Sequence, residues 1–396
     1  MNTAQNIVNV CIASDNNYAP LIATTIASVC FNTTRYVKFW CLESGISDMN
    51  KRLIDSLHGR FSNFEIEYIT IKPQLINDFA SRIATSGHIS PDTYSRLFIP
   101  DLFPKMQKMV YLDVDLIATG DIGELYDIDL GRYELGAVAA DYGVDKSKWF
   151  QNMEMNNAHQ YFNAGVLLMN PMEMHNNGFL GQISEIANKY SKYIVLGDQD
   201  LLNRHYNHDY LELPWRFNLT TRFIEMELGH KDLAHQEQMK AEYSKGVIRH
   251  FESSKKPWNA ERNECNGAKI KNMSDFWAVA AMTPYLTWFE RQFQISKLER
   301  VQGNIWQYIN SGKAMRMPHS YKLFGMLPIL RRRHHGNKTQ YMLLGVIPVL
   351  GCKVKNNGKK HVRRHIPAVF RHIMDGRTAS EKFSQPGFQI DQIGIH

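Results

Sequence analysis

Two aspartates that are two residues apart follow a short apolar stretch, in the segment Tyr111-Leu-Asp-Val-Asp115. If this stretch is a strand, Asp113 and Asp115 face the same side and project together from its end. Two close carboxylates repel each other, and a bound cation relieves that repulsion. Their oxygens suit magnesium or manganese, and either ion can bridge the oxygens of a diphosphate. Because Asp-x-Asp is common by chance and more acidic residues follow, the tripeptide alone favours an acidic loop.

A histidine at the end of a second apolar stretch offers another kind of metal ligand. His250 closes the stretch that begins at Ile248, and Lys256 follows six residues later. An imidazole would complete a metal shell and favour manganese over magnesium. The lysine could neutralise a diphosphate leaving group. Taken in isolation, the segment favours a core histidine beside a solvated lysine.

Polar residues also follow the first apolar stretch of the chain, in Ala13-Ser-Asp-Asn-Asn-Tyr18. Asp15 and Asn17 could hydrogen-bond a base or a ribose, and Tyr18 could stack on the base. An Asn/Asp turn that caps the next helix explains the same residues equally well.

Three shorter segments each carry one polar side chain of interest. Arg96 could bind the phosphate or the sugar of a substrate, or it could form a surface ion pair. Asn163 stands at the start of an apolar stretch, where it could bind sugar hydroxyls or cap a strand. Asp198 follows Gly197 at the start of a helical segment, where it could act in the site or serve as an N-cap.

Strand-like and helix-like segments alternate through the first half of the chain. This rhythm predicts an α/β domain with a largely parallel sheet, in which ligands bind beyond the carboxyl ends of the strands. Strands are expected at 7–13, 37–42, 64–69, 109–112, 135–140 and 165–169, and helices at 19–30, 47–58 (with Ser47 as N-cap) and 91–99. An aromatic helical stretch follows at 273–294.

The composition of the chain is that of a globular protein. The chain has 396 residues, of which 44% are hydrophobic and 21% are charged, as in ordinary globular proteins. We expect no membrane-spanning helix and no secretory signal, because neither an apolar run of about 18 residues nor a basic, apolar and cleavable N-terminus is present. The five cysteines form no C-x-x-C pair. Cys11, Cys30 and Cys41 stand in apolar runs and are predicted to be buried, which fits a reducing cytoplasm.

Charge is distributed unevenly along the chain. From Ser311 onward there are 16 basic and 3 acidic residues, whereas the rest holds 30 basic and 36 acidic residues. Within this basic tail, residues 321–330 are echoed by residues 341–350, and both apolar patches are too short to span a bilayer. Apolar patches beside Lys and Arg suit an anionic membrane surface. A solvated, partly disordered tail and a nucleic-acid-binding tail are the alternatives.

Taken together and in order, these segments resemble glycosyltransferase family 8, which includes lipopolysaccharide glucosyl- and galactosyltransferases and the glycogenins. The resemblance extends from about residue 7 to residue 258. Its motifs are Asp15-Asn-Asn-Tyr18, Tyr94-Ser-Arg-Leu97, Tyr111-Leu-Asp-Val-Asp115, Leu125-Tyr-Asp-Ile-Asp-Leu130, Phe162-Asn-Ala-Gly165, Asp198-Gln-Asp-Leu-Leu-Asn203 and the segment from His250 to Trp258.

The resemblance implies a GT-A fold, a UDP-sugar donor and a manganese ion, with magnesium as the other candidate metal. By motif, Asp113, Asp115 and His250 are implied as metal ligands. The other implied contacts are Asp15, Asn17 and Tyr18 for uridine, Arg96, Asp141, Asn163, Asp198 and Gln199 for the donor sugar, and Lys256 for the diphosphate. Asp141 is placed by spacing rather than by a distinctive motif.

The family retains the configuration of the anomeric carbon. The residue in the candidate nucleophile position is Gln199, an amide, which favours attack by the acceptor from the face of the leaving group. The departing diphosphate oxygen would then take the acceptor proton. One departure from the family pattern is Ser253, which stands where a glycine is common.

The sequence therefore predicts two parts. Residues 1–285 form a GT-A catalytic domain, and residues 286–396 form a helical, basic region suited to a membrane surface. The predicted function is transfer of glucose or galactose to a glycan or glycolipid such as lipopolysaccharide or surface polysaccharide, in the cytoplasm at the inner face of the membrane. One alternative is a nucleic-acid-binding protein. The other is a nucleotidyltransferase, which is disfavoured because such an enzyme requires a glycine-rich phosphate loop where Asp15-Asn-Asn-Tyr18 stands.

Overall fold

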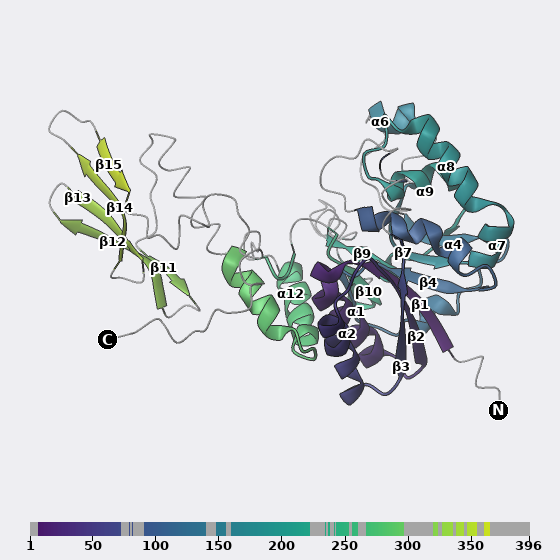
Figure 1. The fold of residues 1–396 in the computed structure, drawn as a ribbon, viewed down its shortest axis with the longest axis horizontal. Coiled ribbons are helices and arrows are strands. Elements are labelled where there is room, and N and C mark those ends of the chain that lie inside the picture. Colours follow the sequence, from purple (N-terminus) through teal and green to yellow (C-terminus); the bar gives the residue numbers. More distant parts are fainter. Residues whose placement is uncertain are drawn as a thin grey trace. The chain divides into compact units, whose positions relative to one another are not determined.

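The computed structural model describes residues 7–72, 79, 81, 91–139, 148–155, 160–221, 234, 237, 241, 243–252, 256–259, 267–296, 320–323, 327–335, 338–343, 347–354 and 360–364. The chain divides into a first unit, Met1–Leu298, and a second unit, Glu299–His396 (Figure 1). The sequence predicts a division after residue 285, whereas the structure divides after Leu298. The physical reason is Phe289, which is fully buried and packs its ring edge-on against Phe276 within the core of the first unit.

A seven-stranded sheet forms the centre of the first unit, in the order β3-β2-β1-β4-β7-β6-β8. Every neighbouring pair is parallel except those that involve β7, which runs antiparallel to both β4 and β6. The predicted α/β fold with a mostly parallel sheet is therefore confirmed. The strands are β1 (Ile7–Ser14), β2 (Tyr36–Glu43), β3 (Phe64–Thr70), β4 (Met109–Leu112), β6 (Leu135–Ala139), β7 (Phe162–Met169) and β8 (Leu211–Glu212).

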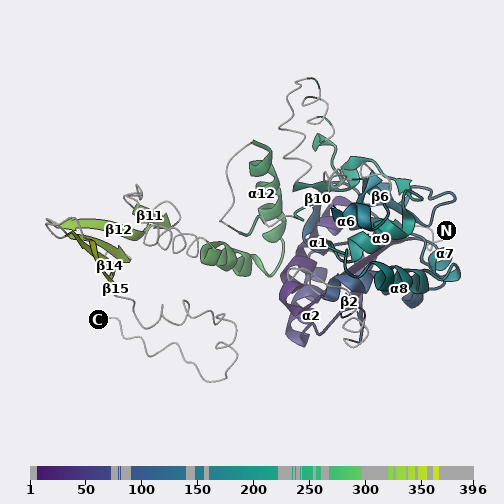
Figure 2. The ribbon, with the colours of Figure 1, turned by 90° about the horizontal axis from the view of Figure 1, so that it is seen from above.

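Side chains of the central strands alternate between two hydrophobic clusters, one on each face of the sheet. In β4, Val110 and Leu112 join the cluster that includes α1 (Ala19–Asn32), whereas Met109 and Tyr111 join the cluster that includes α8 (Phe179–Tyr190). Figures 1 and 2 show α1 and α2 (Asp48–Asp55) on one side of the sheet and α8 and α9 (Asp198–Tyr206) on the other. Burial on both faces explains why these strands read as continuous apolar runs in the sequence.

The remaining helices follow the predicted pattern, with local differences. Ser47 caps α2 as expected, because its hydroxyl accepts a hydrogen bond from the Asn50 amide at 3.3 Å. The segment that begins at Pro91 is a 3-10 helix rather than an α-helix. The other helices are α2 (Asp48–Asp55), α4 (Ile99–Leu102), α5 (Gly123–Tyr126), α6 (Lys148–Asn152), α7 (Pro171–Asn176), α9 (Asp198–Tyr206), α12 (Gly267–Ala280) and the 3-10 helices η2 (Asn16–Tyr18), η3 (Ser56–Gly59), η4 (Pro91–Phe98) and η7 (Trp215–Phe217). Within the described part of the chain, none of the helices has the length and apolar character that crossing a bilayer requires.

A second, three-stranded sheet lies beside the main one. It consists of β5 (Leu116–Ala118), β10 (Ile248–His250) and β9 (Leu219–Thr220), in that order. The central strand β10 runs antiparallel to β5 and parallel to β9. This sheet joins segments more than a hundred residues apart, which periodicity along the sequence does not predict.

The second unit contains a five-stranded antiparallel sheet, whereas the sequence predicts a helical and basic region over 286–396. Of that region, residues 286–296 are helical and belong to the first unit. The strands of the sheet are β11 (Ser320–Leu323), β12 (Leu327–His335), β13 (Lys338–Leu343), β14 (Ile347–Val354) and β15 (Lys360–Arg364), paired in sequence order.

The 20-residue repeat of the tail explains this sheet, because each copy forms one hairpin, β11–β12 or β13–β14. Each hairpin shifts register at the same point of its repeat, where Pro328 pairs with Lys322 and Pro348 pairs with Met342. A proline cannot donate to the ladder and disrupts a helix, so it is tolerated at such irregular positions of a sheet.

Candidate functional site

The two aspartates of the Asp-x-Asp motif lie in the turn between β4 and β5. Hydrogen bonds hold the turn from both sides: the Asp113 amide donates to the Gly165 carbonyl at 2.8 Å, and the Thr25 hydroxyl donates to the Val114 carbonyl at 3.1 Å. The side chains of Asp113 and Asp115 remain 25% and 17% exposed. Both carboxylates are therefore held in place while still accessible to solvent.

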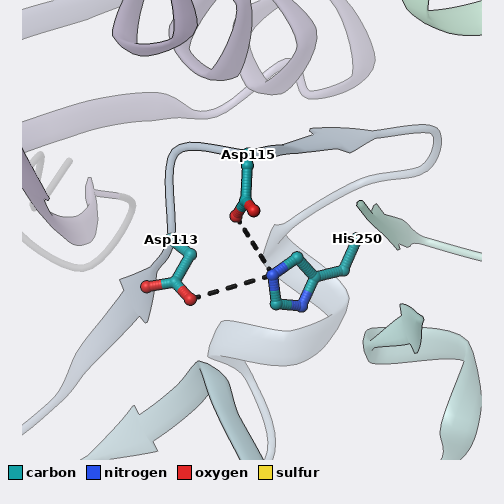
Figure 3. A group of neighbouring side chains, drawn as sticks. All are labelled: Asp113, Asp115 and His250. Carbon is teal, nitrogen blue, oxygen red and sulfur yellow. Dashed lines mark hydrogen bonds and ion pairs between the residues drawn. The ribbon is translucent and has the colours of Figure 1, made fainter. Parts of the chain in front are cut away.

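His250 reaches these aspartates through the pairing of β10 with β5. His250 lies opposite Leu116 in the register, so its ring stands beside the carboxylate of Asp115. The Nε2 atom of His250 lies 3.1 Å from Asp115 Oδ1 and 3.7 Å from Asp113 Oδ2 (Figure 3). The predicted convergence in space of Asp113, Asp115 and His250 is therefore observed, with one donor atom from each within 4.8 Å of the others.

The space between these three side chains fits a cation. Two carboxylates and an imidazole form a suitable donor set for a divalent metal ion. Gly165 keeps that space open, because a Cβ atom added there would come within 2.7 Å of Asp113 Oδ2 and closer still to the His250 ring. Any larger residue at position 165 would push these two side chains out of place.

Charges around the cluster shift the ionisation of its members. Burial alone would raise the pKa of Asp115, but the nearby Lys256 and His250 outweigh it and lower that pKa well below its usual range. Burial alone would lower the pKa of His250, but Asp115 outweighs it and raises that pKa. The Nζ atom of Lys256 lies 2.5 Å from Asp115 Oδ2 and also donates to the Phe251 carbonyl. Cationic side chains thus already stabilise the ionised form of Asp115.

Arg96 lies buried between two carboxylates, so the surface ion pair weighed for it is wrong. Its side chain is 6% exposed and its Nη2 atom lies 2.7 Å from Asp113 Oδ1. Its Nε atom lies 2.8 Å from Asp198 Oδ2, as an ion pair without good hydrogen-bond geometry. Its Nη1 group donates to the Ala164 carbonyl, and its guanidinium lies 4.5 Å from the centroid of the Tyr111 ring. Arg96 therefore connects the Asp-x-Asp turn to the start of α9.

Asp198 is the first residue of α9 and is not its N-cap, which is Gly197. Gly197 adopts φ +63° and ψ −127°, a conformation that side chains with a Cβ atom rarely adopt. Asp198 is only 4% exposed. Burial raises its pKa to about 6, with Arg96 opposing this shift and Asp113 adding to it.

Asn163 and Gln199 contact each other beneath the cluster. Asn163 lies inside β7, next to a register shift in the pairing of β7 with β6, so it does not cap the strand. The Oε1 atom of Gln199 accepts hydrogen bonds from the Ala164 amide at 3.1 Å and from Asn163 Nδ2 at 3.2 Å. The Gln199 oxygen is therefore already committed to two donors.

The predicted uridine contacts lie at the same edge of the sheet. Ile12 of β1 pairs with Leu112 of β4, so the residues that follow β1 emerge beside the Asp-x-Asp turn. Asp15 accepts hydrogen bonds from the Asn17 and Tyr18 amides at 2.9 and 3.2 Å, which is a capping turn. The Tyr18 side chain is 48% exposed. Asp15 therefore has a structural use, and the ring of Tyr18 is accessible for stacking.

Two further predicted residues cannot be placed. Asp141 and Ser253 lie outside the described residues. Conversely, sequence reasoning did not identify two polar residues of the site, Tyr111 and Asn218. The hydroxyl of Tyr111 donates to Asp113 at 2.9 Å, as the two-residue spacing on a strand would have indicated. Asn218 contacts His250 Nδ1 at 3.0 Å, and no local pattern marks it.

This chain is similar to several known proteins. A family model described as "Glycosyl transferase family 8" matches residues 9–262. Glycosyltransferase GlyF of Streptococcus pneumoniae serotype 4 is 29% identical over 293 residues, which cover 73% of this chain and 64% of GlyF. General stress protein A of Bacillus subtilis is 26% identical over 260 residues, which cover 64% of this chain and 88% of that protein.

Two solved structures are similar in fold. A crystal structure of the galactosyltransferase LgtC in complex with donor and acceptor sugar analogues is 26% identical with a TM-score of 0.58, and the match covers 70% of this chain and 96% of LgtC. The apo structure of the bifunctional glycosyltransferase WbbM is 23% identical with a TM-score of 0.59, and the match covers 72% of this chain and 52% of WbbM.

Proposed function

Because this chain belongs to glycosyltransferase family 8, we propose that it transfers a hexose, glucose or galactose, from a UDP-sugar to a glycan or glycolipid. The proposed transfer retains the anomeric configuration and depends on a divalent metal. The acceptor class is lipopolysaccharide or another surface polysaccharide. The observation that supports the proposal best is the convergence of Asp113, Asp115 and His250 at the edge of the sheet, with Lys256 beside them.

The three converging side chains would hold the metal, which we propose is manganese rather than magnesium because one ligand is an imidazole. Bound there, the metal would act as a Lewis acid that neutralises the charge developing on the departing diphosphate. Arg96 and the Tyr111 hydroxyl both bond Asp113 Oδ1, and Asp113 Oδ2 faces His250. These bonds orient Asp113 so that its second oxygen points into the cluster.

Lys256 is proposed to contact the diphosphate. In the structure its ammonium group pairs with Asp115 and the Phe251 carbonyl. A cation bound to Asp115 would take over the role of Lys256 there, and the ammonium group would be free to turn toward the phosphate oxygens. A positive group placed where negative charge develops stabilises the transition state.

The remaining residues would bind the two ends of the donor. We propose that Asp15, Asn17 and Tyr18 contact uridine. Asp141, Asn163, Asp198 and Gln199 are proposed for the sugar, Asp141 on the family resemblance alone. Because all three kinds of nitrogen in Arg96 already have partners, we propose that Arg96 acts on the donor by orienting Asp113 and Asp198.

In the proposed reaction, the acceptor hydroxyl attacks the anomeric carbon from the face that UDP leaves. The bond from that carbon to the acceptor oxygen forms while its bond to the diphosphate oxygen breaks. The departing diphosphate oxygen takes the proton of the acceptor hydroxyl. Gln199 is proposed to orient the sugar rather than attack it, since its oxygen already accepts two N–H groups.

The test is a donor screen that measures UDP release from several UDP-sugars, beginning with UDP-galactose and UDP-glucose, with manganese, magnesium or a chelator. We expect turnover with at least one UDP-sugar and none with the chelator. Asp115→Asn should lose both turnover and metal-dependent UDP binding. The matched control is Asp127→Asn, an exposed carboxylate outside the cluster, which should behave as the wild type. Absence of turnover and binding with every UDP-sugar would contradict the proposal.

We also propose that the second unit binds an anionic membrane surface at the cytoplasmic face, where a lipid-carried acceptor would be found. The register of its sheet places His335, Lys338, Lys353 and His361 opposite one another in one transverse row. Lys338 and Lys353 are paired residues of like charge, which destabilise a sheet, and an anionic surface would relieve their repulsion. Each basic residue at such a surface contributes about 1 kcal/mol.

Vesicle co-sedimentation of the full chain tests this membrane proposal. We expect binding to vesicles that contain anionic lipid and none to neutral vesicles. The double variant Lys338→Glu/Lys353→Glu should bind less, whereas Lys105→Glu/Lys192→Glu in the first unit should not change binding. Binding to nucleic acid but to no vesicle would contradict the proposal and favour a nucleic-acid partner for the basic sheet.

A further inference from the structure

We propose that Asn218 is a positioning residue that holds the proton of His250 on Nδ1, so that Nε2, the ring nitrogen that faces the aspartates, is the one available to a metal ion. The inference rests on the proposed metal site and adds a residue that no motif of the sequence marks. It follows from the direction of each hydrogen bond in a buried chain that begins at the backbone of β7.

Main-chain N–H groups set the direction of the first hydrogen bonds in this chain, because a backbone amide can only donate. The Gly165 amide donates to Asn163 Oδ1 at 2.9 Å, and the Ala164 amide donates to Gln199 Oε1 at 3.1 Å. If the Asn163 amide were turned over, its NH₂ group would face the Gly165 N–H, and two buried donors would meet. The backbone therefore fixes which atom of Asn163 is the oxygen.

Asn218 is fixed in turn by Asn163. Its Nδ2 group donates to Asn163 Oδ1 at 2.9 Å. The reversed amide would place two carbonyl oxygens against each other at a site where Asn218 is 3% exposed. A buried polar group without a partner costs about 1–3 kcal/mol. Asn218 therefore presents Oδ1, an acceptor, on its other side.

That acceptor determines the state of the histidine. Asn218 Oδ1 lies 3.0 Å from His250 Nδ1, and the His250 ring is 2% exposed. An acceptor at this position requires a proton on Nδ1. The Nε2 atom lies 3.1 Å from Asp115 Oδ1, which can only accept, so Nε2 carries a proton there too. A metal ion would displace the Nε2 proton, and the neutral ring, with Nδ1 still protonated, would present its lone pair on Nε2. The nitrogen that faces the aspartates is therefore the one that can ligate a metal.

The same chain continues into the proposed sugar contacts. Asn163 Nδ2 donates to Gln199 Oε1, and Gln199 Nε2 donates to the Tyr161 hydroxyl at 3.3 Å. The Tyr161 hydroxyl donates to the Asp200 carboxylate at 2.6 Å. All these bonds point the same way, from His250 to a terminal acceptor. Asn218 thus joins the metal cluster to the residues proposed to hold the donor sugar.

The test measures the affinity of the full chain for Mn²⁺ and Mg²⁺ without donor, in the wild type, Asn218→Leu and Asn218→Asp. Asn218→Leu removes the acceptor for Nδ1–H, and we expect Mn²⁺ affinity to fall about 10- to 100-fold, as for other residues that orient metal-bound histidines. Mg²⁺ affinity should fall less, because Mg²⁺ depends mainly on oxygen ligands. Asn218→Asp retains an acceptor for Nδ1–H and should restore part of the Mn²⁺ affinity. It should also lower the stability, because its second oxygen replaces the N–H donor that faces Asn163 Oδ1.

The matched control is Asn63→Leu, which removes an amide that donates to three backbone carbonyls in a loop outside the cluster. It should lower the thermal stability and leave Mn²⁺ affinity unchanged. If Asn218→Leu kept the Mn²⁺ affinity of the wild type, or lost Mn²⁺ and Mg²⁺ affinity equally, the role of Asn218 would be contradicted but the proposed metal site would not. Failure of the wild type to bind any divalent ion would overturn the proposed metal site as well.

Discussion

Two pairs of aspartates in the first unit have the same spacing and opposite environments. Asp113 and Asp115 follow the strand β4, whereas Asp198 and Asp200 begin the helix α9. The first pair stays partly exposed, with side chains 25% and 17% accessible. The second pair is buried, at 4% and 0%. The same Asp-x-Asp pattern thus forms an accessible cluster in one place and part of the protein core in the other.

Backbone geometry explains the first difference. The turn after β4 lets both carboxylates converge on His250. On a helix, residues two apart point in different directions. Asp198 accordingly faces Arg96, whereas Asp200 turns back to accept hydrogen bonds from the Val195 and Leu196 amides, each at 2.7 Å.

Neighbouring charge explains the second difference. Burial raises the pKa of both Asp198 and Asp200, for Asp198 to about 6 even with Arg96 beside it. At Asp115 burial acts in the same sense, but Lys256 and His250 outweigh it and lower the pKa. Asp115 in the accessible pair therefore holds the negative charge that a metal ion requires, and the buried pair supports the positions of other groups.

The largest expected effect comes from neutralising the accessible pair. Asp113→Asn removes a proposed metal ligand and the partner of Arg96, so we expect kcat/KM to fall at least about 100-fold, since metal stabilisation of a transition state is worth several kcal/mol. Steady-state kinetics across a range of Mn²⁺ concentrations measures the loss. The matched control is Asp200→Asn in the buried pair, for which the metal requirement should not change. Equal metal dependence in all three proteins would break the comparison.

The next effect is the pH dependence of stability due to Asp198. Its pKa of about 6 in the folded protein lies above the ordinary value of 3.8, so between these values the folded state binds the proton more tightly. The contribution of Asp198 to the free energy of unfolding should therefore be largest below about pH 3.8 and fall by about 3 kcal/mol as the pH rises to about 6. Urea unfolding of the wild type and of Asp198→Asn, each at several pH values with a chelator, measures this contribution as the difference between the two free energies of unfolding. A difference between the two proteins that does not vary with pH would contradict the burial assigned to Asp198.

A smaller effect is expected at Asp200. Asp200→Asn keeps one acceptor oxygen but loses the charge that strengthens its bonds to the Val195 amide, the Leu196 amide and the Tyr161 hydroxyl. We expect a loss of about 2 kcal/mol in the free energy of unfolding. Chemical denaturation measures it, and Mn²⁺ affinity should stay within a few-fold of the wild type. A loss of Mn²⁺ affinity without loss of stability would show that Asp200 behaves like the accessible pair rather than the buried pair.

The smallest effect is expected for an aspartate outside both pairs. Asp127 is 68% exposed and pairs with Arg35 at 2.6 Å. An exposed ion pair contributes less than about 1 kcal/mol, so Asp127→Asn should change stability and Mn²⁺ affinity very little. Thermal unfolding at low and high salt measures the difference. A loss as large as that of Asp200→Asn would mean that burial does not separate these carboxylates.

The sequence predicts the main sheet well, because its strands are buried on both faces. The continuous apolar runs of β1 and β4 indicate buried strands, and the polar residues at their ends mark the edge of the sheet where we propose that the ligand binds. The meeting of Asp113, Asp115 and His250 is predicted through family resemblance rather than periodicity. The pairing of β10 with β5 spans more than a hundred residues, and no local pattern encodes such a register.

Other features were not predictable because they depend on tertiary contacts. Arg96 is equally compatible with a surface ion pair until two distant carboxylates enclose it. Asn218 lies in no recognisable motif, and its orientation follows only from the hydrogen bonds of β7. The second unit differs from prediction since its 20-residue repeat forms hairpins, and prolines at 328 and 348 exclude a long helix but do not by themselves specify strands.

The central claim is that one divalent ion binds between the Asp-x-Asp turn and the end of β10. The most direct measurement is anomalous diffraction at the manganese edge from crystals of the full chain grown with Mn²⁺ and UDP. The account predicts one strong peak, roughly 2.0–2.3 Å from His250 Nε2 and from a carboxylate oxygen of both Asp113 and Asp115. A peak at any other place, or none with UDP bound, would contradict it.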